Sequence, residues 1–186
     1  MKYEVEQKFR VVDLRQIEQS LDELGCKLNE EQLQLDTYFS HPSRDFRKTD
    51  EVLRLRSEGE SNFLTYKGRR VDDTTKTRPE LEIALPNGQD VAAEVLELWR
   101  LLGFAILISV KKIRRTGDFE WQNMDFTVAL DQVEELGAFV ELEILAEDSI
   151  LMSAKEKLAS LAMYLGLTDN ERRSYSELMF SLAQKH

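Results

Sequence analysis

Residues 2–12 read KYEVEQKFRVV, and this stretch places charged side chains at every second position, at Glu4, Glu6 and Lys8. On a β-strand, alternate residues share one face, so two carboxylates and an ammonium group would lie side by side. Most half-buried strands turn their apolar face to the core and their charged face to water. The stretch therefore allows two interpretations: the solvent-exposed face of an edge strand, or the wall of a binding site for a charged ligand.

The same alternation recurs later in the chain, each time as a doublet of one sign. These doublets, with a lysine that alternates with a threonine, are Arg54 and Arg56, Thr65 and Lys67, Glu80 and Glu82, Lys112 and Arg114, and Glu141 and Glu143. A solvated sheet face explains any one doublet, but such faces usually mix both signs with Thr, Ser and Gln. Like charges two positions apart repel unless opposite charges or a ligand compensate them. The repetition therefore favours a charged interior.

Turn residues and apolar periodicity divide the chain into about eight strands with helices at the start, middle and end. We expect strands at 2–12, 32–40, 51–58, 62–68, 80–85, 106–116, 120–131 and 138–146, and helices at 14–24, 90–102, 149–165 and 170–183. Gly59-Glu60 and Gly117-Asp118 are the expected hairpin connections. The polar stretches 41–50 and 69–78 are expected to be loops over a site.

The predicted fold class is α+β, with an eight-stranded antiparallel β-barrel that has a polar interior and helices packed on its outside. Residues 1–186 are predicted to form a single domain, with C-terminal helices at 149–184 that pack on the barrel or cap it. The alternative is an open sheet with helices on one face, which would leave the doublets exposed on an acidic interaction module.

The composition excludes several classes of function. Cys26 is the only cysteine and His41 and His186 are the only histidines, so neither a disulfide, a multi-cysteine zinc site nor a histidine-centred triad is expected. The formal net charge of −10 argues against broad binding to nucleic acid or anionic membranes. The longest apolar run, 101–110, is too short to cross a bilayer, and no apolar signal core precedes it. A cytoplasmic protein is expected.

The mixture of charges suits one kind of ligand. Arginine forks match phosphate oxygens, lysines add point charge, and carboxylates bind Mg²⁺ or Mn²⁺. A purely cationic pocket would bind phosphate without metal, and a purely acidic pocket would bind metal without phosphate. Both sets together predict a site for a complex of metal and triphosphate.

The order of these residues resembles that of a known family. The set Glu4-x-Glu6-x-Lys8, Arg54-x-Arg56, Lys67, Glu80-x-Glu82, Lys112-x-Arg114, Asp131 and Glu141-x-Glu143 resembles the CYTH superfamily, the triphosphate tunnel metalloenzymes. Residues 172–178, RRSYSEL, resemble the closing helix of the class IV adenylyl cyclase branch. The opening residues and Gly137-x-Phe139-x-Glu141 are also similar to that branch.

The resemblance implies a role for each matching residue. It implies metal ligands at Glu4, Glu6, Glu141 and Glu143, and triphosphate contacts at Lys8, Arg54, Arg56, Lys67, Lys112 and Arg114. The residues implied in catalysis are Glu4, Glu6, Lys8, Lys112 and Arg114. Substrate or lid contacts are implied at Glu80, Glu82, Asp131, Arg173 and Tyr175. The implied cofactor is Mg²⁺ or Mn²⁺, with two ions bound together with the substrate, and a homodimer is compatible with the family.

Three activities compete for this site. In a cyclase, the 3′-hydroxyl of ATP attacks the α-phosphorus and pyrophosphate leaves; in a triphosphatase, water attacks the terminal phosphorus of thiamine triphosphate or inorganic triphosphate. The third activity is non-catalytic binding of a nucleotide or polyphosphate. The cyclase-like segments at both ends favour a class IV adenylyl cyclase, although no stretch of the sequence indicates a purine-specific site.

Overall fold

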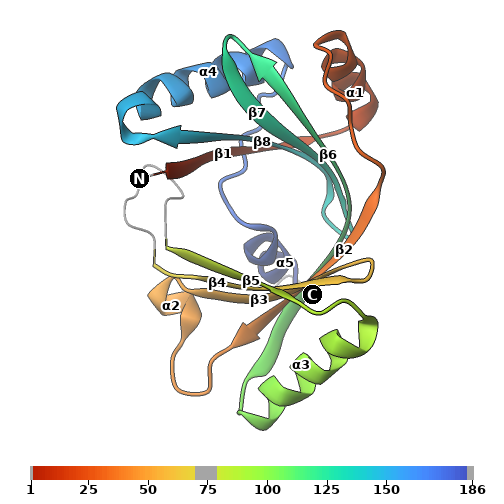
Figure 1. The fold of residues 1–186 in the computed structure, drawn as a ribbon, viewed down its shortest axis with the longest axis vertical. Helices are drawn as coiled ribbons and strands as arrows, with labels where there is room; N and C mark the ends of the chain where they lie inside the picture. Colours follow the sequence, from red (N-terminus) through yellow and green to blue (C-terminus); the bar gives the residue numbers. More distant parts are fainter. Residues whose placement is uncertain (1, 70–78, 184–186) are drawn as a thin grey trace. The chain divides into compact units, whose positions relative to one another are not determined.

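The computed structural model describes residues 2–69 and 79–183, and its strands form one antiparallel sheet in the order β1-β8-β7-β6-β2-β3-β4-β5 (Figure 1). The strands are β1 (Lys2–Val11), β2 (Gln32–Ser40), β3 (Val52–Glu58), β4 (Ser61–Lys67), β5 (Glu80–Leu85), β6 (Ala105–Trp121), β7 (Met124–Val133) and β8 (Gly137–Glu147). The predicted eight-stranded antiparallel sheet is confirmed. Because β1 and β5 end this order, closure into a barrel stays a prediction.

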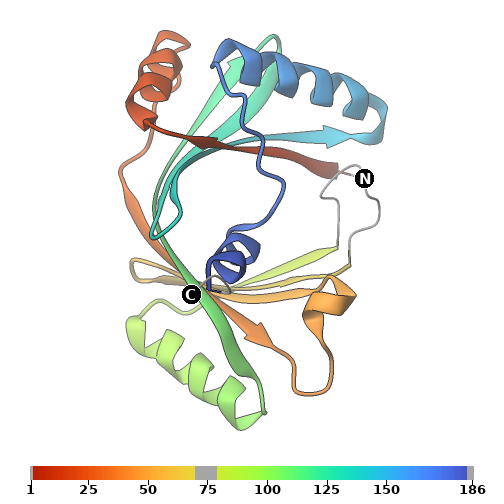
Figure 2. The same cartoon turned by 180° about the vertical axis from the view of Figure 1, so that it is seen from behind.

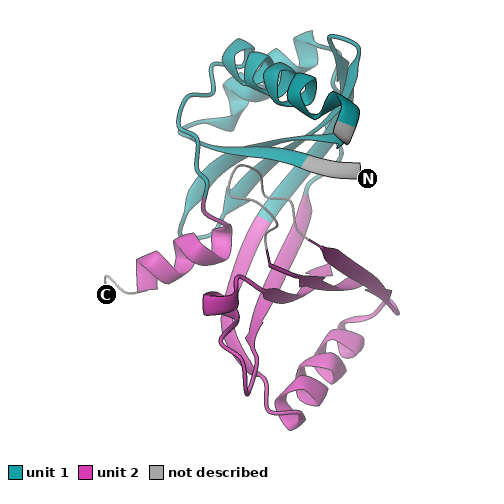
Figure 3. Ribbon diagram, turned by 90° about the vertical axis from the view of Figure 1, so that its left-hand side faces the viewer, with its two compact units in different colours: residues 1–31, 72–77, 113–172 teal, residues 32–71, 78–112, 173–186 magenta. Residues whose placement is uncertain are grey.

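The helices are α1 (Leu14–Glu23), α2 (Phe46–Thr49), α3 (Gln89–Leu101), α4 (Leu151–Tyr164) and α5 (Tyr175–Ala183), with a 3₁₀ turn at Asp148–Ile150. The chain divides into two compact units, shown in Figure 3. Unit 1 comprises residues 1–31, 72–77 and 113–172, and unit 2 comprises residues 32–71, 78–112 and 173–186. The single domain over residues 1–186 stays a prediction.

In unit 1, the apolar residues that alternate with the charged doublets build the core. Val5 and Phe9 of β1 are buried, as are Leu142 and Ile144 of β8, and all four belong to one apolar cluster with the inner side of α4. Leu21 of α1 is fully buried in the same cluster. Figures 1 and 2 both show α1 and α4 on one side of the strands β1 and β8. The charged face of these strands therefore points away from α1 and α4.

Residues 169–171 pair with the outer edge of β1. The backbone N–H of Arg10 donates to the carbonyl of Asp169 at 3.0 Å, and the N–H of Glu171 donates to the carbonyl of Lys8 at 2.7 Å. The predicted helix at 170–183 therefore begins five residues too early, because the backbone at residues 169–171 forms hydrogen bonds with β1 instead. Ser174 caps the helix that follows, since its hydroxyl accepts the N–H of Glu177 and the Glu177 carboxylate accepts the N–H of Ser174.

The hairpin predicted at Gly117-Asp118 is wrong, because β6 runs through both residues to Trp121. The turn lies at Gln122 and Asn123, whose φ angles of 50° and 64° give the left-handed conformation of a two-residue hairpin. Gly117 serves packing instead, since a Cβ there would lie 2.7 Å from the Cys26 sulfur. The other predicted hairpin, at Gly59-Glu60, is confirmed between β3 and β4.

In unit 2, α3 covers the apolar face of the strands. Leu53 and Leu55 of β3 and Phe39 of β2 are buried beneath it, and the ring of Phe39 stacks on Trp99 of α3 with centroids 5.5 Å apart. Figures 1 and 2 both show α3 and α5 on opposite faces of β3, β4 and β5. Alternation therefore directs the arginines of β3 toward the face that carries α5.

Candidate functional site

Three cations of unit 2 converge on one buried carboxylate, that of Asp36 in β2. Lys112 Nζ donates to Asp36 Oδ2 at 2.7 Å, and both side chains are 1% exposed. Arg56, directly opposite Asp36 in the register of β2 and β3, donates from Nε to Oδ1 at 2.6 Å and from Nη2 to Oδ2 at 2.9 Å. Arg54 Nη1 lies 3.9 Å from Oδ2. The predicted phosphate ligands Arg54, Arg56 and Lys112 are thus brought together.

These cations decide the ionisation of Asp36 and its neighbour. Burial alone would raise the pKa of Asp36, but the hydrogen bonds from Arg56 and the charges of Lys112 and Arg54 hold that pKa well below its usual range. Burial, together with the charge of Asp36, raises the pKa of Tyr38 to about 12. At neutral pH the cluster therefore contains a charged carboxylate and a neutral phenol.

A second row of polar side chains lies beside this cluster. Arg54 Nη2 donates to Thr65 Oγ1 at 3.1 Å, and Thr65 Oγ1 donates to Glu82 at 2.9 Å. Lys67 Nζ lies 2.8 Å from Glu80, its partner in the register of β4 and β5. Within the described part of the chain, the buried Arg54 Nε has no hydrogen-bond partner. Glu80 and Glu82 thus contact the predicted phosphate ligands of unit 2, and one arginine keeps a donor unused.

The start of α5 lies over the same cations. Lys112 Nζ is 5.8 Å from the centroid of the Tyr175 ring, and Tyr175 is buried. Arg173, two residues earlier in the chain, is exposed. Of the two residues predicted as substrate or lid contacts at this end, Tyr175 thus lies against the cation cluster of unit 2.

Unit 1 holds a separate charged cluster, centred on Arg114 of β6. Its guanidinium group donates to Asp131 from Nε at 2.7 Å and from Nη2 at 2.5 Å, and Nη2 also donates to Glu141 at 2.5 Å. Lys8 Nζ lies 4.0 Å from the other oxygen of Glu141, its register partner. Lys8 and Asp131 are 2% and 0% exposed. The unit 1 cluster thus joins Lys8, Arg114, Asp131 and Glu141.

Next to it, two carboxylates face each other across a strand pair. Glu6 of β1 is in register with Glu143 of β8, and Glu143 is in register with Thr127 of β7. Directly opposed like charges destabilise a sheet unless a cation lies near them. Glu4 pairs with Leu145 through its backbone, and its side chain lies outside what the structure describes.

The fit of a divalent ion to these residues follows from its coordination chemistry. Mg²⁺ is usually held by one or two carboxylates together with substrate phosphates and water. Glu6 and Glu143 supply such a pair, while across residues 2–69 and 79–183 no three acidic, histidine or cysteine side chains form a ready metal cluster. The predicted ligands therefore suit a metal ion that binds together with the substrate. They suit less well an ion that is held by protein ligands alone.

Asp36 is the residue that the sequence interpretation missed. Its signal was the alternation of Gln34, Asp36 and Tyr38 on one face of β2, in a strand that contains no doublet of like charges. Thr127 was missed too. It is in register with Glu143, and its hydroxyl donates to Asp118 at 2.7 Å. Neither polar residue belongs to a one-sign doublet, so the criterion that identified the other residues excluded both.

The fold and its charged clusters agree with the comparison to known proteins. A family model described as CYTH domain matches residues 2–175, and the chain belongs to this family, whose enzymes act on triphosphates with a divalent metal. The resemblance stated from the sequence is confirmed. None of the helices in the described residues is long and apolar enough to span a membrane.

Three relatives cover nearly the whole chain. A Methanocaldococcus jannaschii protein named "Putative adenylate cyclase" is 34% identical over 180 residues, which are 94% of this chain and 97% of the relative. Adenylate cyclase CyaB of Aeromonas hydrophila is 29% identical, over 95% of this chain and 88% of CyaB. The solved structure of the PH1819 protein from Pyrococcus horikoshii is 36% identical, with a TM-score of 0.80 and coverage of 99% of this chain and 100% of that one.

Proposed function

We propose that this protein is a divalent-metal-dependent enzyme that acts on a triphosphate, and that its activity is the conversion of ATP to 3′,5′-cyclic AMP and pyrophosphate. The observation that carries the proposal is the convergence of Arg54, Arg56 and Lys112 on Asp36. Arg56 and Lys112 already direct their donors to one carboxylate, and the buried Nε of Arg54 lacks a hydrogen-bond partner within the described residues. An anion that accepts several hydrogen bonds would engage these donors.

In this proposal the cations of unit 2 exchange a carboxylate for phosphate. Arg56 and Lys112 are already aimed by Asp36, so little side-chain entropy is lost when phosphate oxygens take over these donors. Thr65 and Glu82 hold Arg54 from its other side. The carboxylates of this cluster thus serve as positioning groups, which accounts for Glu80 and Glu82 without a metal.

In unit 1, Arg114 and Lys8 are proposed as further phosphate contacts, aimed by Asp131 and Glu141. Glu6 and Glu143, with Glu4, are proposed as the metal-binding carboxylates. A divalent ion bound there would neutralise phosphate charge as it develops in the reaction. The proposal therefore divides the predicted acidic residues into metal ligands and residues that orient cations.

Cyclase activity is preferred because two relatives that span nearly the whole chain carry that name. The charged clusters themselves suit any triphosphate, so hydrolysis of inorganic or thiamine triphosphate is the alternative, followed by binding without turnover. We expect the purified chain to form cyclic AMP and pyrophosphate from ATP with Mg²⁺ or Mn²⁺. Phosphate release from inorganic triphosphate or thiamine triphosphate without cyclic AMP from ATP would establish the triphosphatase instead.

The metal assignment has its own test. Glu6→Gln and Glu143→Gln keep the size of each side chain but remove one charge of the opposed pair. Each variant should need on the order of tenfold more Mg²⁺ for half-maximal turnover, the effect of losing one charged ligand. Glu23→Gln, on the exposed side of α1, is the matched control and should leave the Mg²⁺ titration unchanged. An unchanged titration for Glu6→Gln and Glu143→Gln would refute the assignment.

A further inference from the structure

Gln34 of β2 carries a buried hydrogen-bond acceptor without a partner. The residue is 4% exposed, and within the described residues its Oε1 accepts no hydrogen bond. Its Nε2 donates to Glu58 Oε2 at 2.8 Å. Because a carboxylate only accepts hydrogen bonds, Glu58 takes the amide nitrogen and leaves the amide oxygen unused. Buried polar atoms are nearly always paired, so an unpaired one indicates a place for a water or a ligand.

This acceptor lies in the row next to the cation cluster of unit 2. Gln34 and Asp36 share one face of β2, and they are in register with Glu58 and Arg56 of β3. Same-face neighbours on a strand lie about 6.6 Å apart, twice the rise of roughly 3.3 Å per residue. A group held at Gln34 is therefore the immediate neighbour of a group held by Arg56.

The same face also carries a buried donor without a partner. Across residues 2–69 and 79–183, the buried side-chain atoms that lack a hydrogen bond are Gln34 Oε1, Arg54 Nε and Trp121 Nε1. Trp121 belongs to unit 1, whereas Arg54 shares its face of β3 with Arg56. One unused acceptor and one unused donor thus lie on the same face of β2 and β3. A single ligand satisfies both if it carries an anionic group beside a hydrogen-bond donor.

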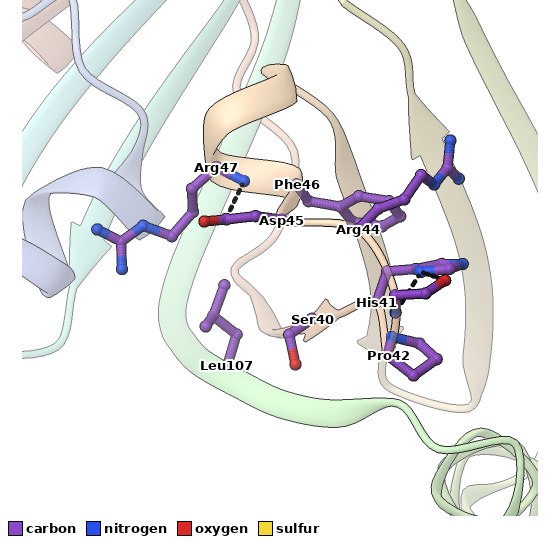
Figure 4. A pocket seen from close by; sticks show the side chains of 9 residues that line it. Ser40, His41, Pro42, Arg44, Asp45, Phe46, Arg47 and Leu107 are labelled. Carbon is purple, nitrogen blue, oxygen red and sulfur yellow. Dashed lines mark hydrogen bonds between the residues drawn. The ribbon is translucent and has the colours of Figure 1, made fainter.

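The opposite end of β2 borders a pocket of about 380 Å³, lined by residues 40–47 and Leu107 (Figure 4). The loop around it uses two of its own polar side chains. Dashed lines in Figure 4 mark the hydrogen bonds from backbone N–H groups of this loop to His41 Nδ1 and to Asp45, both at 3.1 Å. The unused oxygen of Gln34 is therefore the stronger indication of a recognition group on this strand.

The position of Gln34 decides which part of a ligand it would contact. In a nucleotide the sugar directly follows the phosphates, and its hydroxyl groups are hydrogen-bond donors. The row of Gln34 and Glu58 directly follows the row of Asp36 and Arg56, and it offers an amide oxygen and a carboxylate as acceptors. A sugar hydroxyl therefore matches this row both in place and in hydrogen-bonding character.

We propose that Gln34 Oε1 accepts a hydrogen bond from a sugar hydroxyl of the nucleotide and is a specificity-determining residue of the site. The inference rests on the proposed function, in which the phosphates of ATP are held by Arg54, Arg56 and Lys112. Glu58 acts through Gln34 as a positioning residue, because its carboxylate fixes which end of the amide is free. A site with a buried acceptor discriminates against an analogue that leaves this acceptor unpaired.

The test compares ligands that differ by one hydroxyl group. The nucleotide probe is ATP with a methylene bridge between its α- and β-phosphates, which cannot release pyrophosphate, together with its 2′-deoxy and 3′-deoxy forms. Inorganic triphosphate is the fourth ligand, and dissociation constants with Mg²⁺ are measured by isothermal titration calorimetry. We expect one of the deoxy forms to bind the unmodified protein on the order of tenfold more weakly than its parent, the loss of about one hydrogen bond.

Two variants of the full chain assign this loss to Gln34. Gln34→Met keeps the length of the side chain but removes the amide. Glu58→Gln supplies an amide that can donate to Gln34 Oε1, so the acceptor is satisfied within the protein. In each variant the parent nucleotide should bind on the order of tenfold more weakly, and removing the hydroxyl should cause no further loss. Binding of inorganic triphosphate should not change.

The control is Gln19→Met on the exposed side of α1, which should bind all four ligands as the unmodified protein does. If both deoxy forms bind the unmodified protein as tightly as their parent, the inference is refuted. The same holds if Gln34→Met keeps the full discrimination between parent and deoxy form. If the unmodified protein binds inorganic triphosphate but no nucleotide, the triphosphate site stands without the sugar contact. If it binds none of the ligands, the proposed function fails as well.

Discussion

Lys112 Nζ and Asp36 Oδ2 lie 2.7 Å apart, and each of the two side chains is 1% exposed. Removing one member of a buried ion pair leaves an uncompensated charge and costs about 3–5 kcal/mol. Arg56 binds the same carboxylate, so Asp36 keeps its charge in the folded protein. This one carboxylate therefore connects the stability of unit 2 to the orientation of its proposed phosphate ligands.

Asp36→Asn should lower the free energy of unfolding at pH 7 by about 3–5 kcal/mol, because it removes the buried partner of two cations. The pKa of Asp36 is lower in the folded protein than the usual carboxyl value of 3.8. Its stabilisation is thus complete above that value and is lost as the pH falls toward the folded pKa. The difference between the two proteins in urea denaturation should therefore shrink below about pH 4.

Asp13→Asn is the matched control for this substitution. Asp13 caps α1 by accepting the N–H of Arg15, and asparagine caps a helix about as well. Its stability should stay within about 0.5 kcal/mol of the unmodified protein. If Asp13→Asn and Asp36→Asn lowered the free energy of unfolding equally, the stabilising role of the buried ion pair would be contradicted.

Lys112→Ala should weaken the binding of both ATP and inorganic triphosphate by about 10–100-fold, the effect of losing one hydrogen bond to a charged group. Lys111→Ala is the natural control, because Lys111 is exposed and alternation places it on the opposite face of β6. Calorimetric titration with either ligand checks the prediction. A loss of equal size at both positions would indicate a general charge effect rather than a specific contact.

Arg114→Lys keeps the charge but removes the fork that contacts Asp131 and Glu141. We expect kcat to fall on the order of 100-fold, as when one aimed donor is lost from a transition-state site. Arg115→Lys should leave kcat unchanged, since Arg115 contacts the Asn29 carbonyl and Glu18. Steady-state kinetics of both variants make the comparison, and an unaltered kcat in Arg114→Lys would exclude Arg114 from the reaction.

Gly117→Ala should destabilise the protein by about 1–3 kcal/mol through overpacking. The added methyl group would lie 2.7 Å from the Cys26 sulfur and 2.9 Å from the Lys27 carbonyl oxygen. Cys26→Ala in the same chain should restore only part of the stability, because the backbone contact remains. Thermal unfolding of the single and double variants tests this, and a neutral Gly117→Ala would mean that the Cys26 side chain and the backbone at Lys27 can move aside.

The sequence predicted the strands well where alternation was strong. The bounds of β2 and β5 agree with the prediction to the residue, because apolar and polar residues alternate along both strands. It failed at Gly117, where glycine is required by a neighbouring backbone, and at Asn170, where a long-range pairing replaces the expected helix. Local sequence patterns do not indicate contacts between segments that are distant in the chain.

The same distinction applies to the site. One-sign doublets identified Arg54, Arg56 and Lys112, and the structure brings these three together. Their shared partner Asp36 was not identified, because a single carboxylate in an alternating strand looks like any solvated residue. Closure of the barrel, the homodimer and the residue roles stay predictions.

The sequence by itself determined the family, the eight strands and the face on which the charges lie, because alternation is a local property of the chain. Only the tertiary structure decided which charges meet. It showed Lys112 and two arginines around Asp36, Arg114 between Asp131 and Glu141, and a separate apolar pocket beside His41. These contacts join residues as many as 76 positions apart, and strand pairing rather than sequence spacing brings them within hydrogen-bond distance.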